Sequence, residues 1–196
     1  MITLAPIEVD LQFITSVIAT FFLGALILST LVPRKLAVAL MAVKVAVVIA
    51  YFVFFVDGSW FFGGDDLGYA ERGLTLFETG RNPVTIWTHH EAYYLKTATK
   101  SLSLVYFHNF VGMWLFGPHY HAPILLNLII STGTIFFLAR IVEKIFGQRE
   151  LVVPFVVFAS LHWTTIVWHS FLNLKEPLVA FLLSAMIYFV LDLRRR

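Results

Sequence analysis

Long apolar runs without charge constrain this chain more than any other feature of its sequence. Residues 11–32 contain no Asp, Glu, Lys or Arg, and a helix of that length crosses a hydrocarbon core about 30 Å thick. Further long apolar runs occupy residues 36–56, where Lys44 is the one charge, residues 122–142, where Arg140 is the one charge, and residues 151–172 and 177–191, which have none. A soluble domain could not cover so much apolar surface, because 59% of the chain is hydrophobic and only 13% is charged. We therefore expect an all-α fold, a polytopic transmembrane helical bundle of about five spans.

Basic residues gather in three places and predict the orientation of the bundle. The clusters are Arg34 and Lys35; Arg140, Lys144 and Arg149; and Arg194, Arg195 and Arg196. Short basic loops stay cytoplasmic, and all three clusters can do so only if the short apolar run at 102–116 does not cross. We predict an interfacial or re-entrant helix there, and a multi-pass protein of the plasma (inner) membrane with its N-terminus outside and C-terminus cytoplasmic. Six spans would be the alternative.

Composition excludes several classes of function. The chain has no cysteine, which rules out disulfides, thiolate metal sites and cysteine nucleophiles. Its net charge of +2 is too small to indicate a nucleic-acid partner. The expected partner is the lipid bilayer, because of the long apolar runs. Glu8 and Asp10 stand where a signal peptide would be basic, and the first apolar run is therefore interpreted as a retained span.

The predicted outer loop, residues 57–120, begins with an acidic pair. Asp65 and Asp66 follow two glycines, and Asp66 could cap a juxtamembrane helix over residues 67–79. Such a helix would align one apolar stripe, made of Leu67, Ala70, Leu74 and Phe77. An amphipathic helix of this kind lies on a membrane surface. The two carboxylates would bind a divalent cation or take a proton from a hydroxyl, or they would simply cap the helix.

Two more polar groups lie in predicted outer segments. Tyr93 and Tyr94, close to Lys96, would suit a site for a sugar and a phosphate, or would form part of an interfacial aromatic belt. Lys175 and Glu176 separate two apolar runs and precede a proline that suits the first turn of a helix. Because a lysine on the outer face opposes the positive-inside bias, this pair is either functional or an interfacial turn.

Ionisable residues inside predicted spans support other functions. Lys44, His162 and His169 are of this kind, and such groups are costly in a bilayer. On one continuous helix the two histidines would share a face, which we expect to point into the bundle, while Lys44 would snorkel or pair with a carboxylate. These residues leave open a transporter or flippase-like protein, haem or metal ligation by histidines, and a non-catalytic membrane subunit.

The order of these features resembles the N-terminal part of the C superfamily of membrane glycosyltransferases. That family includes lipid-phosphate-sugar-dependent mannosyl and aminoarabinose transferases and bacterial polysaccharide enzymes. The resemblance covers about residues 36–193 and depends on three motifs: Asp65-Asp66-Leu67-Gly68-Tyr69-Ala70-Glu71-Arg72, Trp114-Leu115-Phe116-Gly117 and Leu174-Lys175-Glu176-Pro177.

The resemblance implies transfer of a sugar from a polyprenyl-phosphate donor to an acceptor on the outer face of the membrane. Asp65, Asp66 and Glu176 would be catalytic, with Asp65 and Glu176 holding a divalent cation such as Mg²⁺ or Mn²⁺. Substrate contacts would come from Tyr69, Arg72, Tyr93, Tyr94, His119, His121 and Lys175. Residues 1–35 would form an extra N-terminal span and basic turn. Residues 36–196 would form a partial module, a truncated or split portion of such an enzyme that a partner membrane subunit would complete.

Overall fold

The computed structural model describes the chain at residues 11–54, 65–90, 95, 100–167, 173 and 175–194. All regular structure within these ranges is helical. In this part of the chain, the helices long and apolar enough to cross a membrane are α1 (Leu11–Ser29), α2 (Arg34–Phe54), α6 (His121–Phe146) and α9 (Glu176–Leu193). The expectation of an all-α chain with several candidate membrane spans is confirmed.

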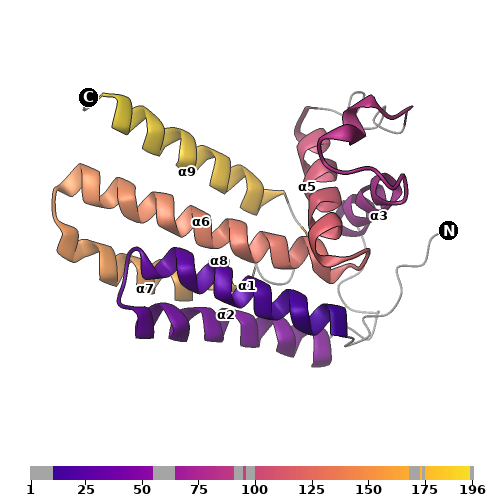
Figure 1. Cartoon of the computed structure of the whole chain (residues 1–196). Helices are drawn as coiled ribbons and strands as arrows, with labels where there is room; N and C mark the ends of the chain where they lie inside the picture. The colour runs from indigo at the N-terminus through magenta and orange to yellow at the C-terminus, as the bar shows by residue number, and fades with distance from the viewer. Residues whose placement is uncertain are drawn as a thin grey trace.

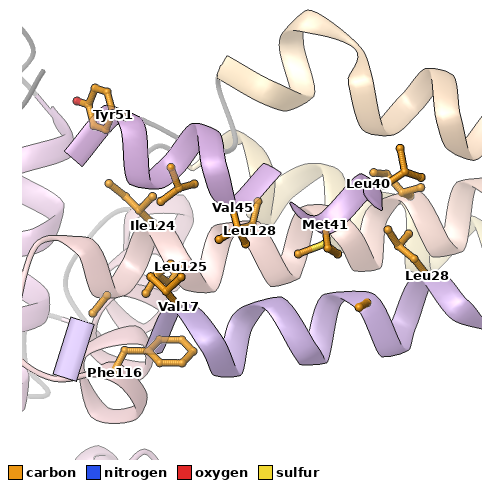
Figure 2. Packing of buried hydrophobic residues seen from close by; sticks show 14 of the residues in the cluster. Val17, Leu28, Leu40, Met41, Val45, Tyr51, Phe116, Ile124, Leu125 and Leu128 are labelled. Atoms are coloured by element: carbon orange, nitrogen blue, oxygen red, sulfur yellow. The ribbon is translucent and has the colours of Figure 1, made fainter. Parts of the chain in front are cut away.

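The long helices lie side by side, and α6 is the central member of the bundle (Figure 1). α6 contacts α1, α7 and α9, and it contacts α5 near its start. Buried apolar side chains of α1, α2 and α6 form one continuous cluster, part of which Figure 2 shows between the helices. Gly24 of α1 lies directly against the Met41 side chain of α2, so these two helices approach closely.

Two helix boundaries follow from single residues. Pro33 precedes α2, and its carbonyl oxygen accepts hydrogen bonds from the backbone N–H groups of Leu36 and Ala37, at 2.9 and 3.0 Å. Proline cannot continue α1 without a clash but suits the beginning of a helix. α6 ends at Gly147, whose φ of 66° places it in the left-handed region and whose N–H donates to the Glu143 carbonyl. Glycine adopts this conformation without steric cost, which makes it a common helix terminator.

Three shorter elements gather at one end of the bundle: α3 (Asp65–Phe77), η1 (Thr85–Thr88) and α5 (Lys100–Phe116). α5 runs across this end rather than along the long helices and packs on both α3 and α6 (Figure 1). Gly112 makes the crossing with α6 close, since a Cβ there would lie 2.9 Å from the Pro123 Cα atom. α5 is not among the candidate spans.

The predicted span at 151–172 is not one continuous helix. After η3 (Arg149–Leu151), α7 (Val152–Leu161) ends at His162, which has extended backbone with ψ of 135°, and α8 (Trp163–Val167) follows at once. β-Branched and aromatic residues fill α8 and are poor helix formers, which favours a break there. His162 is exposed, so the prediction that it points into the bundle is wrong. His169 lies outside the described residues.

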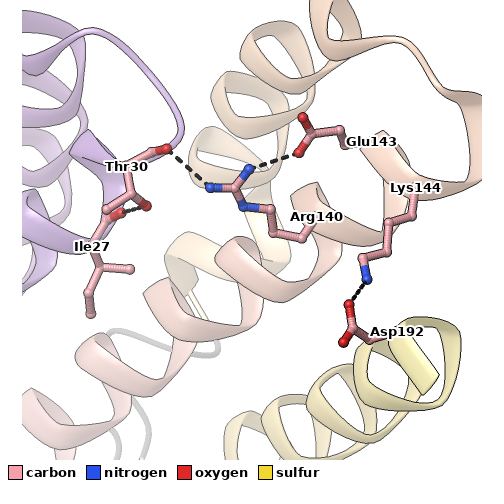
Figure 3. Close-up of polar contacts among 6 residues, drawn as sticks. All are labelled: Ile27, Thr30, Arg140, Glu143, Lys144 and Asp192. Carbon is pink, nitrogen blue, oxygen red and sulfur yellow. Dashed lines mark hydrogen bonds and ion pairs between the residues drawn. The ribbon is translucent and has the colours of Figure 1, made fainter. Parts of the chain in front are cut away.

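The basic clusters meet at the opposite end from α3 and α5. The α1–α2 turn, the α6–α7 turn and the end of α9 all lie at the left of Figure 1. Arg140 of α6 pairs with Glu143 at 2.8 Å and donates to the Thr30 carbonyl oxygen at 3.5 Å, while Lys144 pairs with Asp192 of α9 (Figure 3). Arg195 and Arg196 lie outside the described residues. The chain therefore has one strongly basic end, as its sequence predicts.

Candidate functional site at the end of the bundle

The two acidic motifs begin helices at the same end of the bundle. Asp65 and Asp66 are the first residues of α3, and Glu176 is the first residue of α9 (Figure 1). α3 starts slightly earlier than predicted, so Asp66 lies in its first turn rather than at its N-cap. The structure describes the backbone of Asp65 and Asp66 but not their side chains, and Glu176 is exposed.

One face of α3 packs against α5. Ala70 and Leu74 of the predicted apolar stripe are buried, while Leu67 and Phe77 are half-buried. Tyr69, a predicted substrate contact, is only 5% exposed, and its ring centroid lies 6.2 Å from that of Tyr106 on α5. The other predicted contact on this helix, Arg72, is exposed. Within this motif Tyr69 therefore holds α3 in place, while Arg72 lies on the exposed face of the helix.

Asn109 of α5 joins the two motifs. It packs against Gly73 of α3, where an added Cβ would lie 2.6 Å from the Asn109 Cβ atom. Its Oδ1 accepts a hydrogen bond of 2.5 Å from Asn173 Nδ2, in the turn that leads to α9. Its Nδ2 donates to the Val105 carbonyl oxygen at 2.9 Å, and both asparagines are fully buried. α3 and the start of α9 are thus positioned by the same side chain.

The turn before α9 has the form predicted for it. Lys175 is half-buried, and its carbonyl oxygen accepts a hydrogen bond of 3.0 Å from the Val179 N–H. Pro177 stands in the first turn of α9, where a missing N–H costs nothing. Glu176 beside it is favourable at the positive end of the helix dipole. Stabilisation of the helix start therefore explains the residues of this turn as well as a catalytic role would.

Two predicted substrate contacts lie near the start of α6. His119 and His121 stack with ring centroids 5.2 Å apart and planes 12° apart. His121 is 1% exposed, with the rings of Phe13 and Phe52 at 5.0 and 6.5 Å, whereas His119 is half-buried and covers it. A substrate at this end would meet His119 first. Tyr93 and Tyr94 lie outside the described residues.

The predicted cation site finds no support in the geometry that is described. Among the described residues, no group of three His, Asp or Glu side chains is close enough to hold a metal ion. Glu176 is part of the predicted ligand set, and the Asp65 side chain is not described. A divalent cation bound by these two residues therefore stays a prediction.

Reasoning from the sequence missed a buried polar set where α5 crosses α6, made of His108, Asn109, Asn127 and Asn173. A signal was present, because His108 and Asn109 interrupt the apolar run at 102–116. Burial lowers the pKa of His108 to about 4, against weaker opposite effects from the Asn127 side chain and the Pro123 backbone. His108 is consequently neutral in the folded protein at physiological pH.

This burial predicts lower stability in acid. Between pH 6.5 and 4 the unfolded His108 binds a proton that the folded protein does not, so the free energy of unfolding falls as the pH falls. The loss between pH 7 and pH 5 should be about 2 kcal/mol. Melting temperatures in detergent across this range would show it, and His108→Asn should flatten the curve. The exposed His162→Asn is the control, and an unchanged slope in His108→Asn would contradict the prediction.

A second polar position, Lys44, lies apart from this end in the middle of α2. The side chain is fully buried, and its Nζ donates to Ser131 Oγ of α6 at 3.4 Å. No carboxylate of the described residues lies within ion-pair distance of it. Lys44 therefore does not snorkel, and none of the described carboxylates pairs with it.

The arrangement at the acidic end can support acid–base chemistry on a phosphate-bearing substrate. Carboxylates at the starts of α3 and α9 can accept a proton, and Lys175 and Arg72 can neutralise a phosphate. No protein-family model, curated protein or solved structure matches this chain.

Proposed function

We propose that this chain is a membrane glycosyltransferase, or a portion of one, that transfers a sugar from a polyprenyl-phosphate donor to an acceptor at the membrane surface. One observation carries the proposal: both acidic motifs begin helices at the end of the bundle opposite the basic clusters. Under the positive-inside rule the basic end is cytoplasmic, and the acidic motifs then face outward. α5, which runs across that end, would lie along the outer membrane surface.

The proposed reaction needs a base and a means of stabilising phosphate charge. The acceptor hydroxyl approaches α3, and the Asp65 carboxylate takes its proton. The hydroxyl oxygen bonds to the anomeric carbon while the bond from that carbon to the lipid phosphate breaks, and the phosphate leaves with the electron pair. Lys175 and Arg72 would neutralise the developing charge. A divalent cation held by Asp65 and Glu176 would neutralise the phosphate charge in a similar way.

The position of the site suits a lipid-linked donor. A polyprenyl chain stays in the hydrocarbon, so its phosphate lies at the boundary where α3 and α9 begin. Asn109 would keep these helix starts in a fixed relation while the donor binds. A partner membrane subunit would complete the donor site.

Transfer should depend strongly on Asp65. In vesicles that contain the reconstituted chain, Asp65→Asn is expected to lower the rate of sugar transfer from polyprenyl-phosphate donors by about 100-fold or more, because a general base is lost. Glu71→Gln changes an exposed carboxylate of the same helix and serves as the control. Equal transfer by the wild type and Asp65→Asn would exclude Asp65 as the base. No transfer by the wild type with any donor would favour a non-catalytic subunit.

The sidedness can be measured separately, since the chain has no native cysteine. Single cysteines would replace Arg81, Glu176 and Gln148. These residues are exposed, whereas a label would not reach Asn173, which is buried in the turn before α9. In intact cells, a membrane-impermeant maleimide is expected to label positions 81 and 176 but not 148. If 81 and 176 fall on opposite sides, no shared outer site exists.

A transporter or flippase-like function is the second candidate, and the fully buried Lys44 favours it. His162 is exposed, so it does not continue a path of polar side chains from Lys44 through the inside of the bundle. Flux through such a protein would survive Asp65→Asn, whereas sugar transfer would not. The same reconstituted vesicles therefore separate the two functions.

A further inference from the structure

At the basic end of the bundle, several basic side chains are not in an ion pair with any described carboxylate. Arg140 and Lys144 are paired with Glu143 and Asp192 (Figure 3). Other basic side chains at this end are exposed and have no carboxylate of the described residues within ion-pair distance. We call them the basic rim: Arg34, Lys35, Arg149 and Arg194.

Two residues of the rim, Arg34 and Lys35, are electrostatically unfavourable where they stand. Arg34 and Lys35 lie in the first turn of α2, and no acidic residue lies there. Positive side chains at a helix start are disfavoured by the helix dipole as well as by one another. An anion at this place would relieve both effects.

Apolar surface lies about one turn deeper below the rim. Val38 follows Lys35 by three residues and is 47% exposed. Val153 follows Arg149 by four residues and is 36% exposed, and Val190, four residues before Arg194, is 47% exposed. Residues three or four apart on one helix share a face, so Lys35 and Arg194 stand next to exposed valines, whereas Arg149 of η3 and Val153 of α7 lie on consecutive helices.

We propose that the basic rim binds the headgroups of anionic phospholipids, with the acyl chains lying against the apolar side chains beneath. Ammonium and guanidinium groups form charge-assisted hydrogen bonds with phosphate oxygens, which supplies the headgroup contact. Acyl chains would pack against the exposed valines, whereas a soluble phosphate compound has no apolar chain to do so. Lipid binding at the rim requires only that the helices cross a membrane, and it does not depend on the proposed transferase activity.

Lipid competition on the purified full chain tests this proposal. The protein is equilibrated in detergent micelles with equal amounts of phosphatidylglycerol and phosphatidylcholine, and the retained lipids are quantified by mass spectrometry. Each basic residue near an anionic headgroup contributes about fivefold in affinity, so the triple variant R34Q/K35Q/R149Q should lose at least about tenfold of the preference for phosphatidylglycerol. The matched control is Arg81→Gln, an exposed cation at the other end, which should retain the preference.

Three further measurements make the result decisive. The charge-retaining variant R34K/R149K should bind like the wild type, and high salt should reduce the preference because exposed charges are screened. If the triple variant does not fold, Lys35→Gln and Arg149→Gln alone should each lower the preference about fivefold. An unchanged preference in the rim variants, or an equal loss in Arg81→Gln, overturns the proposal.

Discussion

Replacing Gly73 with alanine should lower the melting temperature of the protein in detergent markedly, although the change adds a single methyl group. The new Cβ would lie 2.6 Å from Asn109 Cβ and 3.0 Å from the Asn109 and Phe110 backbone, so α3 and α5 would have to separate. Overpacking of this kind costs about 1–3 kcal/mol, and disturbance of the Asn109–Asn173 hydrogen bond would add about 1 kcal/mol.

Gly68 on the same helix provides the matched control. A Cβ at Gly68 meets no other atom within 4 Å, so alanine there adds no contact. Because alanine is the better helix former, Gly68→Ala should raise stability by roughly 0.5–1 kcal/mol. If both variants melt alike, Gly73 does not pack against Asn109, and Asn109 does not join α3 to the start of α9.

Replacing Lys44 with methionine should stabilise the protein. The ammonium group is fully buried and meets the Ser131 hydroxyl, while no described carboxylate pairs with it. Methionine has a similar length and needs no polar partner, so the free energy of unfolding should rise by about 1–3 kcal/mol. Thermal melting in detergent measures this, and Lys35→Met, at an exposed position, should change little.

Either a higher or a lower melting temperature of Lys44→Met indicates what the lysine does. A more stable Lys44→Met variant means that the lysine is kept despite its cost, and a matching loss of flux or transfer would then give the reason. A lower melting temperature would mean instead that Lys44 holds α2 and α6 together through contacts beyond Ser131.

Much of the helical framework could be predicted from the sequence, because membrane helices are specified by local composition. The runs at 11–32, 36–56, 122–142 and 177–191 correspond to long helices with ends shifted by a few residues. The common end of the basic clusters was also predictable, since charge sidedness follows from loop order. The break at His162 was not, because no proline or glycine marks it.

The candidate site was predictable only in outline. Asp65 and Glu176 were expected at one end, and the helix starts are there. The contact of Asn109 with Asn173 joins residues 64 positions apart, and no local pattern encodes such a pairing. The burial of Tyr69 and His121 likewise depends on which helices meet, so the roles assigned to them stay predictions.

The central place of α6 has a consequence for how the protein is made. α1, α2 and α6 leave the ribosome before α9 and already share one apolar cluster, so they can assemble without it. α9 then arrives as a helix that buries little of its surface and packs along α6. Aromatic contacts align the two helices, since the Phe137 ring of α6 packs against Phe181 and Tyr188 of α9. The Lys144–Asp192 pair adds a polar contact near the end of this late helix, so the register of α9 against α6, and with it the position of Glu176 at the start of α9, is set by polar and aromatic contacts together.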